Sequence, residues 1–175
     1  RIGCGGYPPK DGTPYWKLVD RARRQYARVA TLARQHGVRA LIETHPGLIT
    51  PSVSKAMAVL KDLNPEGVGI MWDPGNEVCE GMETCAMALD MAGDYLAEIH
   101  VKNASWDRRD MLDGRQAWTT ASCPVHLGIV NWPLIVGELR RAGYKGWLMF
   151  EDFSTAEPLD RRLARNVKWF RKLLA

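Results

Sequence analysis

The segment Val68-Gly-Ile-Met-Trp-Asp73 decides the fold class of this protein. Small and apolar residues run without a break up to a carboxylate, and Pro74 and Gly75 follow at once. A short apolar run that ends at such breaking residues is typical of a strand buried on both faces, as the strands of parallel sheets are. The sequence therefore predicts that Asp73 lies at the carboxyl end of a buried strand.

The same pattern occurs before and after this segment. Arg39-Ala-Leu-Ile-Glu43 and Gly146-Trp-Leu-Met-Phe-Glu151 also end on a carboxylate. Leu96-Ala-Glu-Ile-His-Val101 carries His100 near its end, and Arg1–Gly5 has the composition of a clipped strand. Between these strands, apolar residues recur three or four positions apart, which predicts helices at about 16–36, 51–63, 82–92, 133–142 and 163–174. Strands that alternate with helices indicate an α/β fold of parallel β/α units.

The composition fits one globular domain that spans residues 1–175. A hydrophobic fraction of 46% allows a sizeable core, and a formal net charge of +4 is too small to indicate nucleic acid as a partner. The four cysteines form no C-x-x-C pair, and free thiols favour a cytoplasmic location. We find no signal peptide and no membrane-spanning run, so no membrane partner is expected. The oligomeric state stays open, and a homo-oligomer is compatible with the sequence.

Four successive strands place a charged or imidazole side chain at an equivalent position, namely Glu43, Asp73, His100 and Glu151. In a β/α barrel the carboxyl ends of all strands open onto one face, where these side chains would converge. Three carboxylates that meet without a cation repel one another, and a divalent metal removes this repulsion. Three oxygen ligands and one imidazole suit one Mn²⁺, Mg²⁺, Co²⁺ or Zn²⁺ ion. The alternative is that the four groups merely end their strands and face solvent or helix N-termini.

Four segments carry a family resemblance: Ile42-Glu-Thr-His45, Trp72-Asp-Pro-Gly-Asn76, Glu98-Ile-His-Val-Lys-Asn103 and Leu148-Met-Phe-Glu151. Their order and spacing resemble the sugar phosphate isomerase/epimerase family with the xylose isomerase-like TIM barrel. The resemblance runs from about Arg1 to the C-terminus. It implies a (β/α)8 barrel, present here as about five β/α units that begin near strand four, and it implies that the four strand-end residues hold one divalent metal.

The activity that this resemblance implies is metal-dependent isomerisation or epimerisation of a sugar or a sugar phosphate. In such a site the metal makes the C–H next to the substrate carbonyl acidic and stabilises the enediolate. By resemblance, Glu43 and Glu151 are the catalytic acid/base pair that removes and returns the proton. Asp73 and His100 would then be ligands only.

Three neighbours of these residues are candidate contacts to the substrate. His45 and Asn76 closely follow the first two ligands, and Lys102 lies two residues past His100, on the same side of the strand. A plain loop histidine and a pocket-rim salt bridge are the alternatives for His45 and Lys102. The polar composition of residues 103–130 predicts a long loop, which is a candidate lid.

Other functions remain open. A metal-dependent dehydratase of a polyol or keto acid would use the same proton abstraction and then expel a hydroxyl group. A non-catalytic barrel fragment would keep the ligands but expose two sheet edges. An endonuclease IV-like repair enzyme would need a multi-zinc cluster with more histidines than the four present, and Asn76 stands where a ligand histidine would be wanted. We therefore expect a small-molecule substrate and no nucleic acid.

Overall fold

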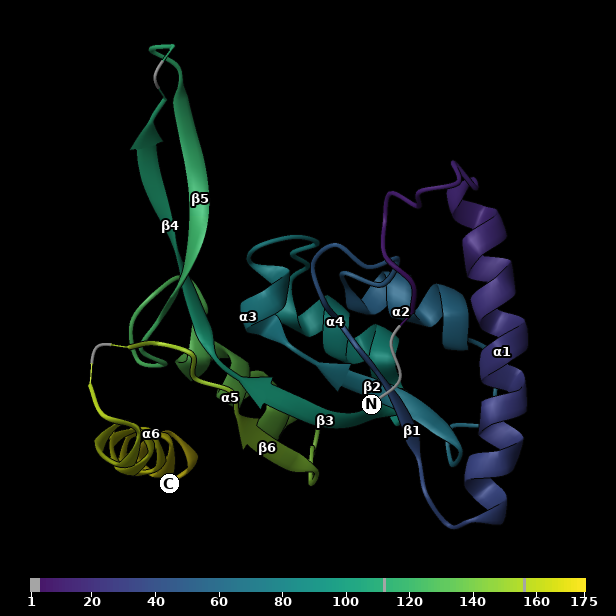
Figure 1. Cartoon of the computed structure of the whole chain (residues 1–175). Coiled ribbons are helices and arrows are strands. Elements are labelled where there is room, and N and C mark those ends of the chain that lie inside the picture. The colour runs from purple at the N-terminus through teal and green to yellow at the C-terminus, as the bar shows by residue number, and fades with distance from the viewer. Residues whose placement is uncertain (1–3, 112, 156) are drawn as a thin grey trace.

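The computed structural model describes residues 4–111, 113–155 and 157–175. Its main sheet has four parallel strands in the order β1-β2-β3-β6 (Figure 1). These strands are β1 (Ala40–Glu43), β2 (Val68–Trp72), β3 (Leu96–Val101) and β6 (Trp147–Phe150). Ile42 pairs with Ile70, and His100 pairs with Met149. Because all four strands run in the same direction, their carboxyl ends share one edge of the sheet.

A row of helices lies along one side of this sheet (Figure 1). The row consists of α1 (Tyr15–Gln35), α2 (Val53–Leu60), α4 (Cys85–Ala92), α5 (Trp132–Arg141) and α6 (Leu159–Leu174). Each helix contacts the next one in the row, α1 also contacts β1 and β2, and α2 contacts β2. The sequence-predicted alternation of strands and helices is thus confirmed. Among the described residues, none of the helices combines the length and apolarity needed to cross a bilayer.

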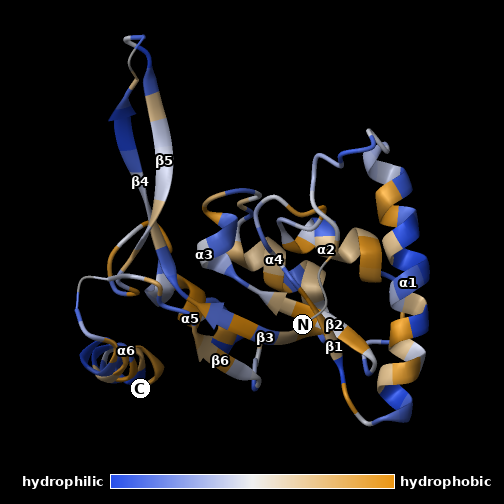
Figure 2. Cartoon of the chain, in the orientation of Figure 1, coloured by the Kyte–Doolittle hydropathy of each residue, from blue (hydrophilic) through white to orange (hydrophobic). Residues whose placement is uncertain are grey.

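The core lies between the sheet and the helices, which turn apolar stripes inward (Figure 2). Side chains with no exposed surface include Ile42, Val68, Ile70, Ile99 and Val101. Burial of a side chain of this size contributes about 1.5–3 kcal/mol. Every residue of β2 is buried, as its unbroken apolar run predicts. This packing holds the strand ends in fixed positions.

Two short helical elements were not expected from the sequence. α3 (Pro74–Glu77) begins where Pro74 and Gly75 predict only a break, and η1 (Gly93–Tyr95) precedes β3. The Asp73 side chain caps α3 by accepting a hydrogen bond from the Asn76 N–H, and proline fits the first turn of a helix. Of the strand expected at the N-terminus, residues 1–3 lie outside the described residues. Gly6 forms an isolated bridge with Leu48.

The prediction of a long polar loop at residues 103–130 was wrong. Strands β4 (Asn103–Asp110) and β5 (Gln116–Cys123) form an antiparallel hairpin that projects away from the main sheet (Figure 1). Exposed and half-buried residues alternate along β5, as they do in a strand with two different faces. The charged residues of this segment gave it the polarity of a loop, although its tryptophans and threonines favour a strand.

Candidate metal centre

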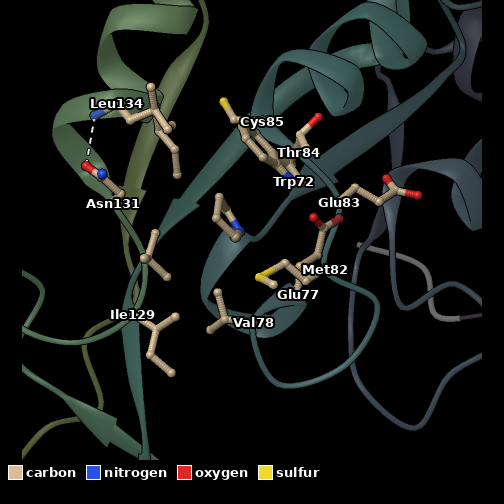
Figure 3. A pocket seen from close by; sticks show the side chains of 13 residues that line it. Trp72, Glu77, Val78, Met82, Glu83, Thr84, Cys85, Ile129, Asn131 and Leu134 are labelled. Carbon is tan, nitrogen blue, oxygen red and sulfur yellow. Dashed lines mark hydrogen bonds between the residues drawn. The ribbon is translucent and has the colours of Figure 1, made fainter.

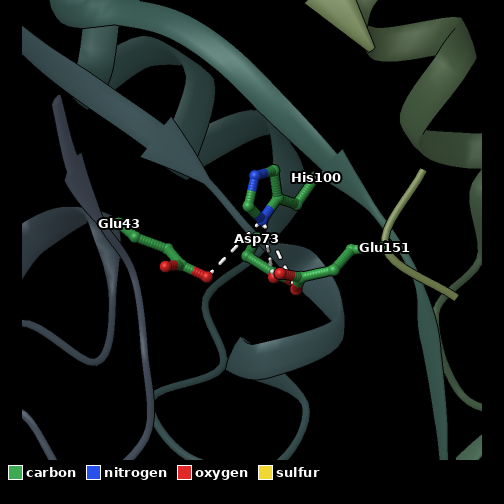
Figure 4. Close-up of side chains that lie close together, drawn as sticks. All are labelled: Glu43, Asp73, His100 and Glu151. Carbon is green, nitrogen blue, oxygen red and sulfur yellow. Dashed lines mark ion pairs between the residues drawn. The ribbon is translucent and has the colours of Figure 1, made fainter. Parts of the chain in front are cut away.

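The carboxyl edge of the sheet brings the four predicted metal ligands together (Figure 4). Glu43 ends β1, Asp73 follows β2, His100 lies in β3 and Glu151 follows β6. One possible ligand atom from each residue lies within 4.8 Å of the others. Glu151 is half-buried and the other three are buried. The convergence expected from four strand ends is therefore present in the structure.

His100 lies at the middle of this cluster. Its Nδ1 atom is 3.4 Å from Oε1 of Glu43, 3.5 Å from Oδ2 of Asp73 and 3.5 Å from Oε2 of Glu151. This nitrogen is buried and forms no hydrogen bond of regular geometry. Neighbouring ligand atoms that share one ion at bond lengths of roughly 2.0–2.2 Å lie about 2.8–3.6 Å apart, from octahedral to tetrahedral geometry. The donor set and its spacing fit one small divalent cation.

The electrostatics of the cluster also favour a cation. Burial lowers the pKa of His100, but its polar contacts with Asp73 and Glu43 and the charge of Glu151 outweigh burial and raise this pKa to about 9. In the metal-free protein, His100 is therefore protonated at neutral pH. Its positive charge then offsets part of the repulsion among the three carboxylates.

Two further side chains hold Glu43 and Asp73 in place. Nδ2 of Asn76 donates to Oδ2 of Asp73 at 2.9 Å, to the backbone oxygen of Thr44 at 2.9 Å and to Oε1 of Glu43 at 3.3 Å. The Thr44 hydroxyl accepts a hydrogen bond from the N–H of Asp73 at 2.9 Å. Contacts of this kind behind the ligands fix ligand orientation in metal sites.

Lys102 brings a second positive charge to the cluster. Its Nζ atom lies 2.9 Å from Oδ2 of Asp73 and 2.5 Å from Oε2 of Glu151. Burial lowers the pKa of Lys102, but the interactions with Asp73 and Glu151 outweigh burial and raise this pKa. Gly75 makes room for the lysine, because a Cβ atom at this position would collide with the Lys102 side chain. The ion pair considered for Lys102 is therefore formed.

The three residues considered for substrate binding border one cavity of about 240 Å³. His45 lies at its rim, with Nδ1 2.7 Å from the Pro46 oxygen. Lys102 also borders this cavity. Asn76 is only 7% exposed, and its amide nitrogen already donates to three acceptors. It is therefore less able than the other two residues to donate a hydrogen bond to a substrate.

Other parts of the cavity wall come from residues that the sequence did not single out. Thr120 and Ser122 of β5 border the cavity, and so does Phe153, which follows β6. The Phe153 ring centroid lies 5.4 Å from Nζ of Lys102. The alternation of residues along β5 would have identified the strand. No local signal, however, connects that strand to the cavity.

Known proteins share this architecture. A model of the family described as a xylose isomerase-like TIM barrel matches residues 2–173. The chain belongs to this family. The expected α/β class and barrel family are thereby confirmed, and the four parallel strands with their row of helices form part of a xylose isomerase-like TIM barrel.

Three known proteins are similar to this chain. Inosose dehydratase of Mesomycoplasma hyopneumoniae (strain 7448) is 25% identical over 138 residues, which cover 73% of this chain and 46% of that protein. A D-tagatose 3-epimerase-like protein matches with a TM-score of 0.75 at 14% identity, over 99% of this chain and 60% of that one. A xylose isomerase-like TIM barrel protein from Mycobacterium smegmatis in complex with magnesium matches with a TM-score of 0.65 at 23% identity. This match covers 91% of this chain and 50% of that one. The two structural likenesses bear on the fold alone. The chain spans between 46% and 60% of the length of these three proteins.

Proposed function

We propose that the cluster binds one divalent metal ion and that the protein removes a proton next to the carbonyl group of a sugar or polyol-derived ketone. Epimerisation or isomerisation through an enediolate is the first candidate reaction. The proposed metal ligands are Glu43, Asp73, His100 and Glu151. Glu43 and Glu151 are also the proposed acid and base. The donor set suits Mn²⁺, Mg²⁺, Co²⁺ or Zn²⁺, and the magnesium bound by the M. smegmatis relative supports a hard divalent ion.

The placement of the two glutamates carries this proposal. β1 and β6 stand at the two ends of the sheet order, so Glu43 and Glu151 approach His100 from opposite sides (Figure 4). Two carboxylates placed in this way can remove a proton from one face of a carbon and return one to the opposite face. Asp73 and His100 come from the inner strands, which suits residues that act only as ligands.

The residues around the centre would divide the remaining work. A divalent ion held here supplies Lewis acidity, which makes the C–H next to the substrate carbonyl more acidic. Asn76 keeps the Glu43 and Asp73 carboxylates in position. His45 and Lys102 border the cavity and can donate hydrogen bonds to substrate oxygens.

Lys102 also favours a second candidate reaction, which is dehydration. Glu151 would remove the proton from carbon, the neighbouring C–O bond would break, and the hydroxyl group would leave as water with a proton from the Lys102 ammonium group. The lysine lies 2.5 Å from Glu151, which could return that proton to it. The name of the inosose dehydratase relative points to the same class of reaction.

Exchange of substrate hydrogen with solvent tests the proposal. Metal-loaded protein is incubated with ketohexoses and inososes in D2O, and NMR measures deuterium uptake at the carbon next to the carbonyl group. We expect exchange in the parent protein and its loss in Glu43→Gln and in Glu151→Gln. The control is Glu66→Gln, because the Glu66 side chain is exposed and pairs with Arg34 on the surface. An epimeric or isomeric product supports the first reaction, and loss of water supports dehydration.

Circular dichroism and elemental analysis of each variant separate a folding or metal-binding defect from a loss of chemistry. Exchange that persists in both glutamine variants would contradict the acid/base roles. A folded protein that takes up no metal after loading with Mn²⁺ or Zn²⁺ would contradict the metal centre itself. The non-catalytic fragment would then be the better description.

A further inference from the structure

A second cavity, of about 390 Å³, lies next to α3 (Figure 3). This volume lies within the range of small-molecule sites. One wall contains Val78 and Met82. The opposite wall contains Ile129, which precedes α5, and Leu134, which lies in the first turn of α5. Most of the side chains around it are apolar. The cavity can therefore hold the apolar body of a small ligand.

The short helix α3 separates this cavity from the metal centre. Pro74 and Glu77 border the second cavity, whereas Gly75 and Asn76 border the cavity beside Lys102. None of the four candidate metal ligands borders the second cavity. A ligand bound here would therefore lie outside the proposed metal centre and its cavity.

The charged residues that border the second cavity are acidic. Glu77 and Glu83 carry carboxylates, and none of the described residues that border it is Lys, Arg or His. Glu83 accepts hydrogen bonds from the N–H of Ser54 at 3.2 and 3.3 Å. Glu77 is only 3% exposed, and it takes part in none of the ion pairs between described residues. An organic anion would be repelled by this lining, and a cation would be attracted.

Glu77 is surrounded by hydrogen-bond donors that suit a carboxylate. The N–H of Val53 donates to its Oε1 atom at 3.0 Å. The Trp72 indole N–H is close enough to lower the pKa of Glu77 but is buried without a hydrogen bond of regular geometry. Burial nevertheless raises the pKa of Glu77 to about 8, because no positive charge compensates for the lost water. A cation that entered the cavity would supply this missing charge.

We propose that the cavity between α3 and α5 is a binding site for an organic ammonium ion with an apolar body, and that Glu77 pairs with the ammonium group. The apolar body would lie against Met82, Ile129 and Leu134, and Glu83 would add a second negative charge at the wall. A charged pair inside an apolar cavity is stronger than the same pair in water, which would give the site its preference for cations.

Calorimetric titration above pH 8, where the Glu77 carboxyl has lost its proton, tests this site with three probes of nearly equal shape. The probes are 2-phenylethylammonium, the neutral 2-phenylethanol and the anion 3-phenylpropionate. We expect one saturable site for the ammonium ion. The affinity for the alcohol should be lower by about tenfold or more, and the anion should not bind. Glu77→Gln should lower the affinity for the ammonium ion by about tenfold and leave the alcohol unchanged.

Leu134→Trp is a second variant that does not alter the charge. Leu134 is 54% exposed, so a larger side chain can be accommodated there. Tryptophan at this position should weaken the binding of both the ammonium ion and the alcohol, because Leu134 borders the cavity. Leu159→Trp in α6 is the matched control, because Leu159 is 59% exposed and does not border the cavity. Equal affinity for the ammonium ion and the alcohol, no effect of Glu77→Gln, or no saturable binding would each overturn the proposal. The titrations use metal-free protein, so their outcome does not depend on the proposed catalysis.

Discussion

The ammonium nitrogen of Lys102 lies 2.9 Å from Oδ2 of Asp73, the same carboxylate oxygen that lies 3.5 Å from Nδ1 of His100. The side chain of a lysine therefore already interacts with an oxygen that we propose as a metal ligand. A divalent ion and an ammonium group that share one carboxylate repel each other and compete for it.

Removing this competitor should strengthen metal binding. We expect Lys102→Met to raise the affinity for Mn²⁺ by at least about tenfold, because Asp73 and Glu151 lose a bound positive charge. Isothermal titration calorimetry of the metal-free protein measures this change. Lys61→Met, at an exposed position, is the matched control. Equal or weaker binding by Lys102→Met would show that the lysine supports the ion.

The affinity for metal should rise with pH. The pKa of His100 in the metal-free protein is about 9, so an ion that binds at neutral pH must displace a proton from its imidazole. We expect the association constant to increase about tenfold per pH unit from pH 7 to 8, with about one proton released per ion. Calorimetry in two buffers of different ionisation enthalpy counts the protons. An affinity that does not change with pH in this range would contradict the raised pKa.

Asn76→Asp should make the fold dependent on metal. The substitution replaces the N–H donor toward Glu43 and Asp73 by a further carboxylate oxygen. We expect the metal-free protein to lose about 1–3 kcal/mol of unfolding free energy. Added Mn²⁺ should recover this loss, because it binds the folded state. Urea unfolding with and without the ion measures both effects.

Asn64→Asp is the control for this substitution. Asn64 is exposed, and its side-chain oxygen accepts a hydrogen bond from the N–H of Glu66 at 2.8 Å, a role that aspartate retains. This variant should be nearly as stable as the parent protein under both conditions. A similar loss in the two variants would mean that the hydrogen bonds of Asn76 do not stabilise the cluster.

The stability of the protein should fall as pH rises because of Glu77. Burial raises the pKa of this carboxyl from 4.5 to about 8, so the folded state retains a proton that the unfolded state has released. The stabilisation is complete below pH 4.5 and is lost as pH rises through about 8. Relative to Glu77→Gln, we expect a loss of up to about 1.4 kcal/mol per pH unit in this window. Urea unfolding of both proteins at several pH values gives the difference, and a constant difference would contradict the prediction.

The positions of the candidate ligands could be predicted because they depend on short stretches of sequence. Glu43, Asp73 and Glu151 each close an apolar run, and the geometry of parallel β/α units then brings the strand ends to one edge. His100 followed from the same reasoning, although Val101 comes after it in the strand. For these residues the local pattern and the fold class together are sufficient.

Other features depend on packing between segments that are distant in the sequence. The contact between Lys102 and Asp73 requires the absence of a side chain at Gly75, which no periodicity reveals. The cavity at Glu77 is bordered by residues of β2, α3, α4 and α5, which are distant in the sequence. The β4–β5 hairpin was not predicted because its charged residues give this segment the composition of an exposed loop. Tertiary contacts decide such features, and propensity does not.

Asp73 and Asn76 lie within a single turn of chain, three residues apart, at the start of α3. This candidate ligand and the amide that orients it therefore move as one rigid piece, whereas the distance from Glu43 to His100 depends on the register of three strands. Insertions in the loops between strands would leave the Asp73–Asn76 turn intact. The turn is thus the most portable fragment of the centre, and the one that a protein engineer could graft onto another parallel sheet with the fewest changes.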